Sequence, residues 1–272
     1  MIKQAIIPLA GLGTRLLPLT SVFPKELLPM NGKPGIEYIL DECIEAGIKE
    51  VICIISTKKK LIKNYFFNDN FYKKIMKKKK DNRIIKEYKK IQKYKKMIRF
   101  VYQNKPLGTG DAVLKTKSYI KDKFFLMLLP DDLIIKKNCS KAMISIHNRK
   151  KDCSVIASMK VPKKTVNRWG IFLKEKNLDE ENFYIKDVIE KPEIDKAPSN
   201  NAVIGRYILP KQIFRNLKYQ KKGKGGEIHI TDTIKQLIID GHKFIGHNFK
   251  GKYLDCGTMH GYIRSSKEIS RI

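Results

Sequence analysis

Two glycines, an arginine and a lysine near the start of the chain are residue types that hold polyphosphate groups. Gly11, Gly13 and Arg15 follow an apolar run that begins at Ala5, and Lys25 comes ten residues later. Glycines let backbone amides approach an anion closely, arginine presents a planar fork to phosphate oxygens, and lysine presents a compact charge. The glycines alone are equally compatible with a tightly packed turn. Together with the two cations they indicate a phosphate-binding loop after a first strand, where α/β sheets bind ligands.

Two aspartates, Asp131 and Asp255, each follow a short apolar run. A carboxylate at the C-terminal end of a strand in such a sheet faces the same crevice as the glycine loop. Mg²⁺ is commonly held by one or two carboxylates together with substrate phosphates, so the pair suits a metal site. Each aspartate also precedes a plausible helix, so the residues themselves are equally compatible with helix N-caps. Asp132 is interpreted as a cap or as a group that supports its neighbour.

Five segments, taken in their order along the chain, resemble the signatures of the sugar-1-phosphate nucleotidylyltransferases. They are Gly11-Leu12-Gly13-Thr14-Arg15, Pro24-Lys25-Glu26-Leu27-Leu28-Pro29, Leu129-Pro130-Asp131, Glu190-Lys191-Pro192 and Leu254-Asp255-Cys256-Gly257. Each segment is a weak signal by itself, but their shared order is specific and the resemblance covers nearly the whole chain. It implies that Arg15 and Lys25 are catalytic and that Asp131 and Asp255 bind Mg²⁺.

The resemblance also implies which residues surround the two substrates. Gln103 would read the edge of a uracil base, and nearby glycine backbone would lie close to the base and ribose. Glu190 would bind sugar hydroxyls, Lys191 the sugar phosphate, and Gly170 would lie against the sugar ring. The implied nucleotide-binding residues are Leu9, Ala10, Gly11, Gly13, Gln103, Gly108 and Gly110, and the implied sugar-phosphate-binding residues are Gly170, Glu190 and Lys191.

Two further segments, Ala197-Pro198-Ser199-Asn200 and Gly205-Arg206-Tyr207-Ile208-Leu209, resemble the uridylyl-transferring branch of this family in particular. The implied substrates are UTP and glucose 1-phosphate, joined by an in-line displacement that releases diphosphate, and the implied assembly is a homo-oligomer, a dimer or a tetramer. Transfer of a thymidylyl group, or use of another sugar 1-phosphate, is the nearest alternative. The likeness departs at the unusually basic block Lys73–Lys96 and at Gly225, where close relatives often carry an acid.

The elements that must position these residues follow from hydrophobic patterning. Residues 3–8 and 50–55 are short runs rich in isoleucine, typical of buried parallel strands, and apolar residues at helical spacing lie between them. Pro34 near the start of that expected helix and Gly47 just past its end match the usual asymmetry of helix termini. The order strand, helix, strand predicts a right-handed βαβ unit.

The remainder of the chain predicts a mixed sheet. Two further strands are expected at 98–102 and 124–129, and the second half has short strands separated by polar loops, which indicates a mixed or antiparallel portion. The predicted fold class is α/β, with a Rossmann-like, mostly parallel sheet flanked by helices and a smaller β-rich sugar-binding portion. One domain is expected over 1–272, with a nucleotide-binding half at 1–135, a sugar-phosphate-binding half at 136–272 and a basic helical insertion at 73–96.

The formal net charge of +30 raises the question of nucleic-acid binding. The excess is lysine spread along the whole chain, and its densest block, Lys73–Lys96, is interpreted as a solvated helical insertion. A non-enzymatic nucleic-acid-binding protein is therefore the remote alternative. The five cysteines are scattered, with no C-x-x-C pair, as in a reduced cytoplasmic protein. No apolar run long enough for a membrane helix and no signal segment is found, so we expect a cytoplasmic location and no membrane partner.

Overall fold

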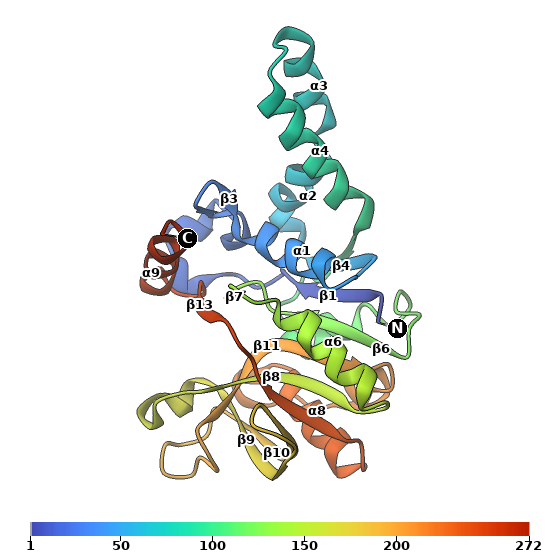
Figure 1. Ribbon diagram of the computed structural model, residues 1–272, viewed down its shortest axis with the longest axis vertical. Coiled ribbons are helices and arrows are strands. Elements are labelled where there is room, and N and C mark those ends of the chain that lie inside the picture. The colour runs from blue at the N-terminus through green and yellow to red at the C-terminus, as the bar shows by residue number, and fades with distance from the viewer. Residues whose placement is uncertain (1, 272) are drawn as a thin grey trace.

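A nine-stranded mixed sheet runs through the computed structural model, which describes residues 2–271 (Figure 1). Its strands lie in the order β5-β4-β1-β6-β11-β8-β12-β10-β9. In chain order these are β1 (Gln4–Pro8), β4 (Glu50–Ile55), β5 (Ile98–Tyr102), β6 (Phe124–Leu128), β8 (Ser154–Lys160), β9 (Gly170–Asn177), β10 (Asn182–Glu190), β11 (Asn201–Pro210) and β12 (Phe244–Asn248).

The two halves of the sheet differ in strand direction. β1 pairs in parallel with β4 and β6, and β4 pairs in parallel with β5. β11 then runs antiparallel to both β6 and β8, while β12 is parallel to β8 and antiparallel to β10. This confirms the predicted fold class, a Rossmann-like mixed sheet with a more antiparallel second half.

Helices cover both faces of the sheet, because the strands are apolar on both sides. Along β1, Ala5 and Ile7 belong to one buried cluster and Ile6 to the other. The helices are α1 (Gly35–Glu45), α2 (Lys60–Phe67), α3 (Asp69–Lys78), α4 (Asn82–Met97), α5 (Thr109–Leu114), α6 (Cys139–Arg149), α7 (Ile213–Tyr219), α8 (Ile230–Ile239) and α9 (Met259–Ile269). None of the helices within residues 2–271 is long and apolar enough to cross a membrane.

Helices α3 and α4 form an arm that stands clear of the sheet (Figure 1). The basic block expected at 73–96 falls on both of these helices, and every lysine of α3 is exposed. The root of the arm is anchored by two acids of α1: Glu37 forms an ion pair with Lys90, and Asp41 accepts a hydrogen bond of 2.6 Å from the hydroxyl of Tyr94. The arm is therefore fixed at its base and solvated toward its tip.

Two short antiparallel ribbons, which the sequence analysis does not predict, lie outside the main sheet. One pairs β2 (Pro29–Met30) with β3 (Lys33–Pro34), and the other pairs β7 (Asp132–Ile135) with β13 (Lys252–Asp255). These ribbons are too short to give a pattern of alternating apolar residues. The second ribbon matters most, because it joins the segment after β6 to the segment before α9.

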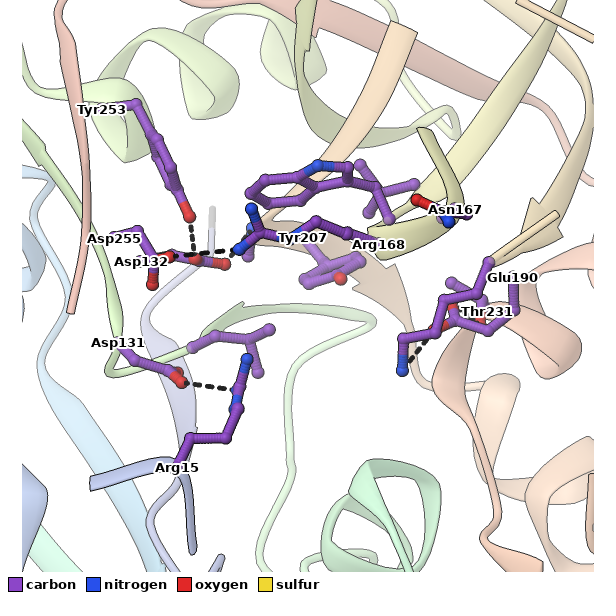
Figure 2. A pocket seen from close by; sticks show the side chains of 16 residues that line it. Arg15, Asp131, Asp132, Asn167, Arg168, Glu190, Tyr207, Thr231, Tyr253 and Asp255 are labelled. Atoms are coloured by element: carbon purple, nitrogen blue, oxygen red, sulfur yellow. Dashed lines mark hydrogen bonds and ion pairs between the residues drawn. The ribbon is translucent and has the colours of Figure 1, made fainter. Parts of the chain in front are cut away.

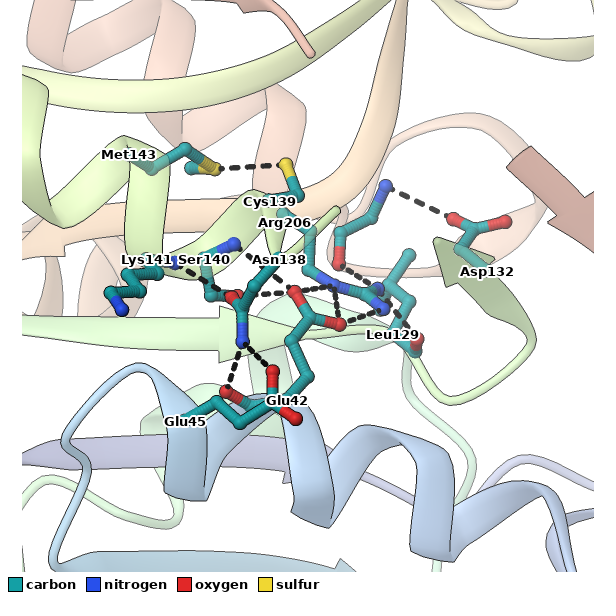
Figure 3. Close-up of polar contacts among 11 residues, drawn as sticks. Glu42, Glu45, Leu129, Asp132, Asn138, Cys139, Ser140, Lys141, Met143 and Arg206 are labelled. Atoms are coloured by element: carbon teal, nitrogen blue, oxygen red, sulfur yellow. Dashed lines mark hydrogen bonds and ion pairs between the residues drawn. The ribbon is translucent and has the colours of Figure 1, made fainter. Parts of the chain in front are cut away.

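A buried ion pair ties α1 to the middle of the sheet (Figure 3). The side chain of Arg206 on β11 is 0% exposed, and its Nη2 lies 2.8 Å from Glu42 Oε2 on α1. Arg206 Nε also donates to both oxygens of Glu42, at 3.0 and 3.1 Å. Ser140 at the start of α6 donates its hydroxyl to the same carboxylate at 2.5 Å. Burial would lower the pKa of Arg206, but Glu42 outweighs it and raises that pKa.

The remaining nitrogen of this guanidinium, Nη1, donates hydrogen bonds to two backbone carbonyls. Arg206 Nη1 donates to the carbonyl of Leu129 at 3.2 Å and to that of Gly205 at 3.1 Å. Leu129 directly precedes Pro130 and Asp131, so the ion pair fixes the turn that carries a predicted metal ligand.

We predict that Glu42→Gln lowers the free energy of unfolding by about 3–5 kcal/mol, because removing one partner of a buried ion pair leaves the other charge uncompensated. Urea unfolding of the purified variant measures this loss. Glu45→Gln, at an exposed position of the same helix, is the matched control and should change stability little. Equal losses of unfolding free energy in the two variants would show that the buried pair contributes no more to stability than an exposed acid does.

Candidate active site

Two cavities of about 580 and 570 Å³ open at the C-terminal ends of β1, β5 and β6. They share lining residues and therefore form one continuous cleft. The shared residues are Arg15, Leu129, Asp131, Glu190, Lys191, Tyr207 and Thr231. We refer to the cavity that contains Asp255 and Gly170 as the first cavity, and to the one that contains Lys25 and Gln103 as the second cavity.

The loop after β1 carries Arg15 into this cleft. Gly13 has a φ of +70°, in the left-handed region where a side chain would be strained, and it precedes the short 3₁₀ turn Thr14–Leu16. The Arg15 side chain on that turn is 65% exposed. Its guanidinium is therefore accessible to an incoming anion. Lys25 opens a second 3₁₀ turn, Lys25–Leu27, on the same wall.

Arg15 and Lys25 converge on one carboxylate. Lys25 Nζ lies 2.6 Å from Asp131 Oδ2, and Arg15 Nη2 lies 3.8 Å from the same oxygen. Burial would lower the pKa of Lys25, but the charges of Asp131 and Glu26 outweigh it and raise that pKa. Burial would likewise raise the pKa of Asp131, and Lys25 instead holds it below its ordinary value. Both groups are therefore charged at neutral pH.

The ribbon of β7 and β13 brings the two predicted metal ligands together. Asp132 and Asp255 are register partners, and the amide of Cys256 donates to the carbonyl of Asp131 at 2.8 Å. A strand follows Asp131, and Thr258 is the N-cap of α9. The helix-cap alternative is therefore wrong for both Asp131 and Asp255.

The space between the two carboxylates is kept open by a glycine. A Cβ added to Gly257 would lie 2.9 Å from Asp131 Oδ2 and 3.2 Å from Asp255 Oδ1, so both oxygens converge on one point. Carboxylate oxygens are the ligands that Mg²⁺ prefers, and this pair fits a divalent cation. Within residues 2–271, no group of three or more acidic, His or Cys side chains gathers to hold a metal. A cation here would therefore need further oxygens from substrate phosphates.

Asp132, the first residue of β7, connects the ribbon to β11 of the main sheet. Its Oδ1 accepts a hydrogen bond of 2.6 Å from the hydroxyl of Tyr253 (Figure 2). Its Oδ2 accepts one of 3.0 Å from the amide of Gly205. Burial, followed by the nearby charge of Asp131, raises the pKa of Asp132 to about 6. This position agrees with the interpretation of Asp132 as a supporting group.

The second cavity contains most of the residues that the resemblance assigns to the nucleotide. Leu9 and Gly110 are the exceptions. The Leu9 side chain is buried in the core, and the amide of Gly110 donates to the carbonyl of Ile228 at 2.7 Å. The assigned residues that do line this cavity are Ala10, Gly11, Gly13, Gln103 and Gly108.

Glu190, Lys191 and Gly170 line the first cavity. The hydroxyl of Thr231 donates to Glu190 Oε2 at 2.9 Å, and Lys191 Nζ lies 3.4 Å from Glu190 Oε1. Lys191 has a φ of +46°, a left-handed conformation that is uncommon for a lysine, and its amide donates to the carbonyl of Trp169 at 2.9 Å. The turn after β10 thus places both charged side chains at the same cavity.

The first cavity also contains Asn167 and Arg168, which the sequence analysis did not single out, and Tyr207, to which it gave no role of its own (Figure 2). Arg168 Nη2 lies 3.7 Å from Asp255 Oδ2, so each predicted metal ligand has a cation beside it. The sequence could have indicated Arg168, because this cation directly precedes Trp169 and Gly170, and Gly170 is assigned to the sugar. Tyr207 belongs to the segment 205–209 that resembles the uridylyl-transferring branch, but its place in the cavity follows from the path of β11.

The fold and this cleft define a class of protein: an α/β enzyme that handles phosphorylated nucleotides, with a cationic glycine loop facing paired carboxylates. A family model described as nucleotidyl transferase matches residues 4–271. This chain belongs to the nucleotidyl transferase family.

Relatives and solved structures agree with this family. The chain is 38% identical over 266 residues to a UTP–glucose-1-phosphate uridylyltransferase of Mycoplasma pneumoniae, covering 97% of this chain and 91% of that protein. It is 34% identical to the Bacillus subtilis protein of the same name, covering 99% and 91%. A crystal structure of UDP-glucose pyrophosphorylase complexed with UDP-glucose has a TM-score of 0.88 and 35% identity, covering 100% of this chain and 99% of that one.

The raised pKa of Asp132 gives a testable pH dependence. Because the folded-state pKa, about 6, lies above the unfolded value, the native state binds this proton more tightly. The resulting stabilisation is fully present below the unfolded pKa and is lost as the pH rises through about 6. We therefore expect the stability of wild type relative to Asp132→Asn to fall by about 2–3 kcal/mol from pH 4 to pH 7. Urea unfolding across that range measures it, and a constant difference would contradict the assignment.

Proposed function

We propose that this chain transfers the uridylyl group of UTP to glucose 1-phosphate, forming UDP-glucose and diphosphate. The proposal rests first on relatives of that name that are 34–38% identical over nearly its whole length. It is supported by the way the two cavities meet at Asp131, Arg15 and Lys191, between the regions assigned to nucleotide and sugar. This continuity is the observation that carries the proposal, because the two substrates must react at their phosphates.

In this reaction a phosphate oxygen of glucose 1-phosphate attacks the α-phosphorus of UTP. The bond from that phosphorus to the bridging oxygen breaks, and diphosphate leaves with the electron pair. Both substrates are polyanions, so positioning and charge stabilisation are the main catalytic tasks. Mg²⁺ bound by Asp131 and Asp255 would supply positive charge to phosphate oxygens.

The other side chains of the cleft stabilise charge and bind the two substrates. Arg15 and Lys25 stabilise the negative charge that grows on the departing diphosphate. Lys191 binds the phosphate of glucose 1-phosphate, and Glu190 accepts hydrogen bonds from the sugar hydroxyls. Gly170 would lie beside the sugar ring, because a Cβ at this position would come within 3.3 Å of Glu190 Oε2, an atom of the carboxylate assigned to the sugar hydroxyls.

The nucleotide-binding half is assigned to residues 1–135 and the sugar-phosphate-binding half to 136–272. A homo-oligomer, a dimer or a tetramer, is supported by five apolar side chains that are exposed on one segment, Leu12, Leu17, Leu19, Val22 and Phe23. A cytoplasmic location is supported by the five cysteines, which are all free thiols.

The decisive experiment is a coupled assay of diphosphate release with glucose 1-phosphate and each of UTP, dTTP, CTP, ATP and GTP. We expect turnover with UTP to exceed turnover with every other nucleotide. Faster turnover with dTTP, or with a different sugar 1-phosphate, would replace the proposed substrates within the same chemistry. Absence of diphosphate release with every pair would refute the proposal.

Asp131→Asn and Asp255→Asn should each abolish Mg²⁺-dependent turnover while leaving the fold intact. Asparagine keeps the shape of the side chain but removes the charge that a divalent cation requires. Turnover titrated with Mg²⁺, alongside thermal unfolding, measures both parts of the prediction. Asp122→Asn, at the bend directly before β6, serves as the control for loss of one acid. A variant with an unchanged Mg²⁺ requirement would remove that aspartate from the metal site.

Glu190→Gln should separate sugar recognition from nucleotide recognition. A carboxylate accepts hydrogen bonds roughly twice as strongly as a neutral amide, so the apparent affinity for glucose 1-phosphate should fall. UTP-induced thermal stabilisation should stay nearly constant. Equal losses for both ligands would mean that Glu190 supports the local fold, and a loss confined to UTP would contradict its assignment to the sugar.

A further inference from the structure

A carboxylate lies directly behind the glutamine of the second cavity. Gln103 follows β5 and lines that cavity, and its Nε2 donates to Asp111 Oδ2 at 2.7 Å and to the carbonyl of Gly108 at 3.2 Å. Gln103 and Asp111 are each only 6% exposed. An ionised carboxylate and a backbone carbonyl have no proton to donate. The amide nitrogen of Gln103 must therefore face them, and the orientation of the side-chain amide is fixed by chemistry.

The same arrangement determines what Gln103 offers to a ligand. With its nitrogen turned toward Asp111, its Oε1 is the atom left for the cavity. In the part of the chain that the structure describes, nothing donates to Oε1, and this oxygen is not among the polar atoms buried without a partner. The cavity therefore presents a hydrogen-bond acceptor at Gln103. A ligand that matches it must present an N–H or O–H donor.

We infer that Asp111 is a specificity-determining residue that makes the nucleotide pocket select uracil over cytosine. Uracil carries a proton on N3 and can donate to Gln103 Oε1. Cytosine has a lone pair at N3, which would face the lone pairs of Oε1 and leave both groups without a partner, a costly outcome in a buried site. The inference rests on the proposed assignment of this cavity to the base of a nucleotide.

The acid at position 111 favours one orientation of the Gln103 amide, because a carboxylate can accept a hydrogen bond from the amide nitrogen but cannot donate one to the amide oxygen. An asparagine or a serine there could donate as well as accept, so that only the carbonyl of Gly108 would still favour this orientation of the glutamine amide. The other carboxylate oxygen, Oδ1, lies 3.7 Å from Lys115 Nζ, and this lysine is 48% exposed. Lys115 is therefore a neighbour on the solvent side, and it offers a control that leaves the bond to Gln103 in place.

The test is the preference for UTP over CTP, measured as a ratio of dissociation constants by calorimetry. Four proteins are compared: wild type, Asp111→Ala, Gln103→Ala and the double variant, with Lys115→Gln as control. Losing a hydrogen bond to a charged group should lower the UTP preference of Asp111→Ala about tenfold or more. In the Gln103→Ala background the same substitution should not change the ratio further, and Lys115→Gln should keep the wild-type ratio.

Three results would overturn the inference. The first is a wild type that binds UTP and CTP with equal affinity, and the second is an Asp111→Ala variant with the wild-type ratio of dissociation constants. The third is an equal drop in this ratio when Asp111→Ala is made in the wild type and in the Gln103→Ala background. Should Asp111→Ala not fold, Asp111→Asn keeps the size of the side chain and must also weaken the UTP preference. Binding needs no turnover, so these results are independent of diphosphate release. A protein that selects UTP through Asp111 but releases no diphosphate would refute the proposed function and keep this inference.

Discussion

The buried pair of Glu42 and Arg206 is the interaction on which the rest of this structure depends. A guanidinium removed from water must have every donor satisfied, and here the partners come from α1, from β11 itself and from the turn after β6. Because desolvating two charges is costly, the arrangement in which Glu42, Leu129 and Gly205 accept hydrogen bonds from this guanidinium is strongly favoured over any that leaves the charges unpaired. That arrangement sets where the chain emerges at Asp131, and through the ribbon of β7 and β13 it also sets the place of Asp255.

Within the cleft, anions and cations alternate before any substrate arrives. Asp131 lies between Lys25 and Arg15, Asp255 has Arg168 beside it, and Glu190 has Lys191. In this state the cleft has little net charge, although the chain as a whole is strongly basic. Substrate phosphates and a divalent cation bring charges of both signs, and they can exchange for these internal partners without leaving a buried charge alone. Exchange of partners costs less than creation of an unpaired group.

The sequence predicted the parallel strands well, because runs such as 50–55 are apolar on both faces and bounded by clear breaks. Helix α1 was predicted for similar reasons, since Pro34 and Gly47 mark its ends. The β7–β13 ribbon was not predicted, because four-residue strands far apart in the chain have no pattern of their own. The roles of Asp111 and Arg206 were missed for a related reason: each depends on a partner brought close only by the completed sheet. Resemblance to a family located the residues of the cleft, whereas the contacts that hold them came from the structure.

The position of β12 has a consequence for synthesis of the chain. This strand lies inside the sheet, between β8 and β10, although it is made after both of them. Until it leaves the ribosome, β8 has an unpaired edge next to apolar faces, an arrangement prone to join another chain. Asp255 follows only a few residues later, so closure of the sheet and completion of the carboxylate pair occur almost together. Nascent chains are therefore prone to aggregate until β12 pairs with β8, and the carboxylate pair of the cleft is completed at nearly the same time.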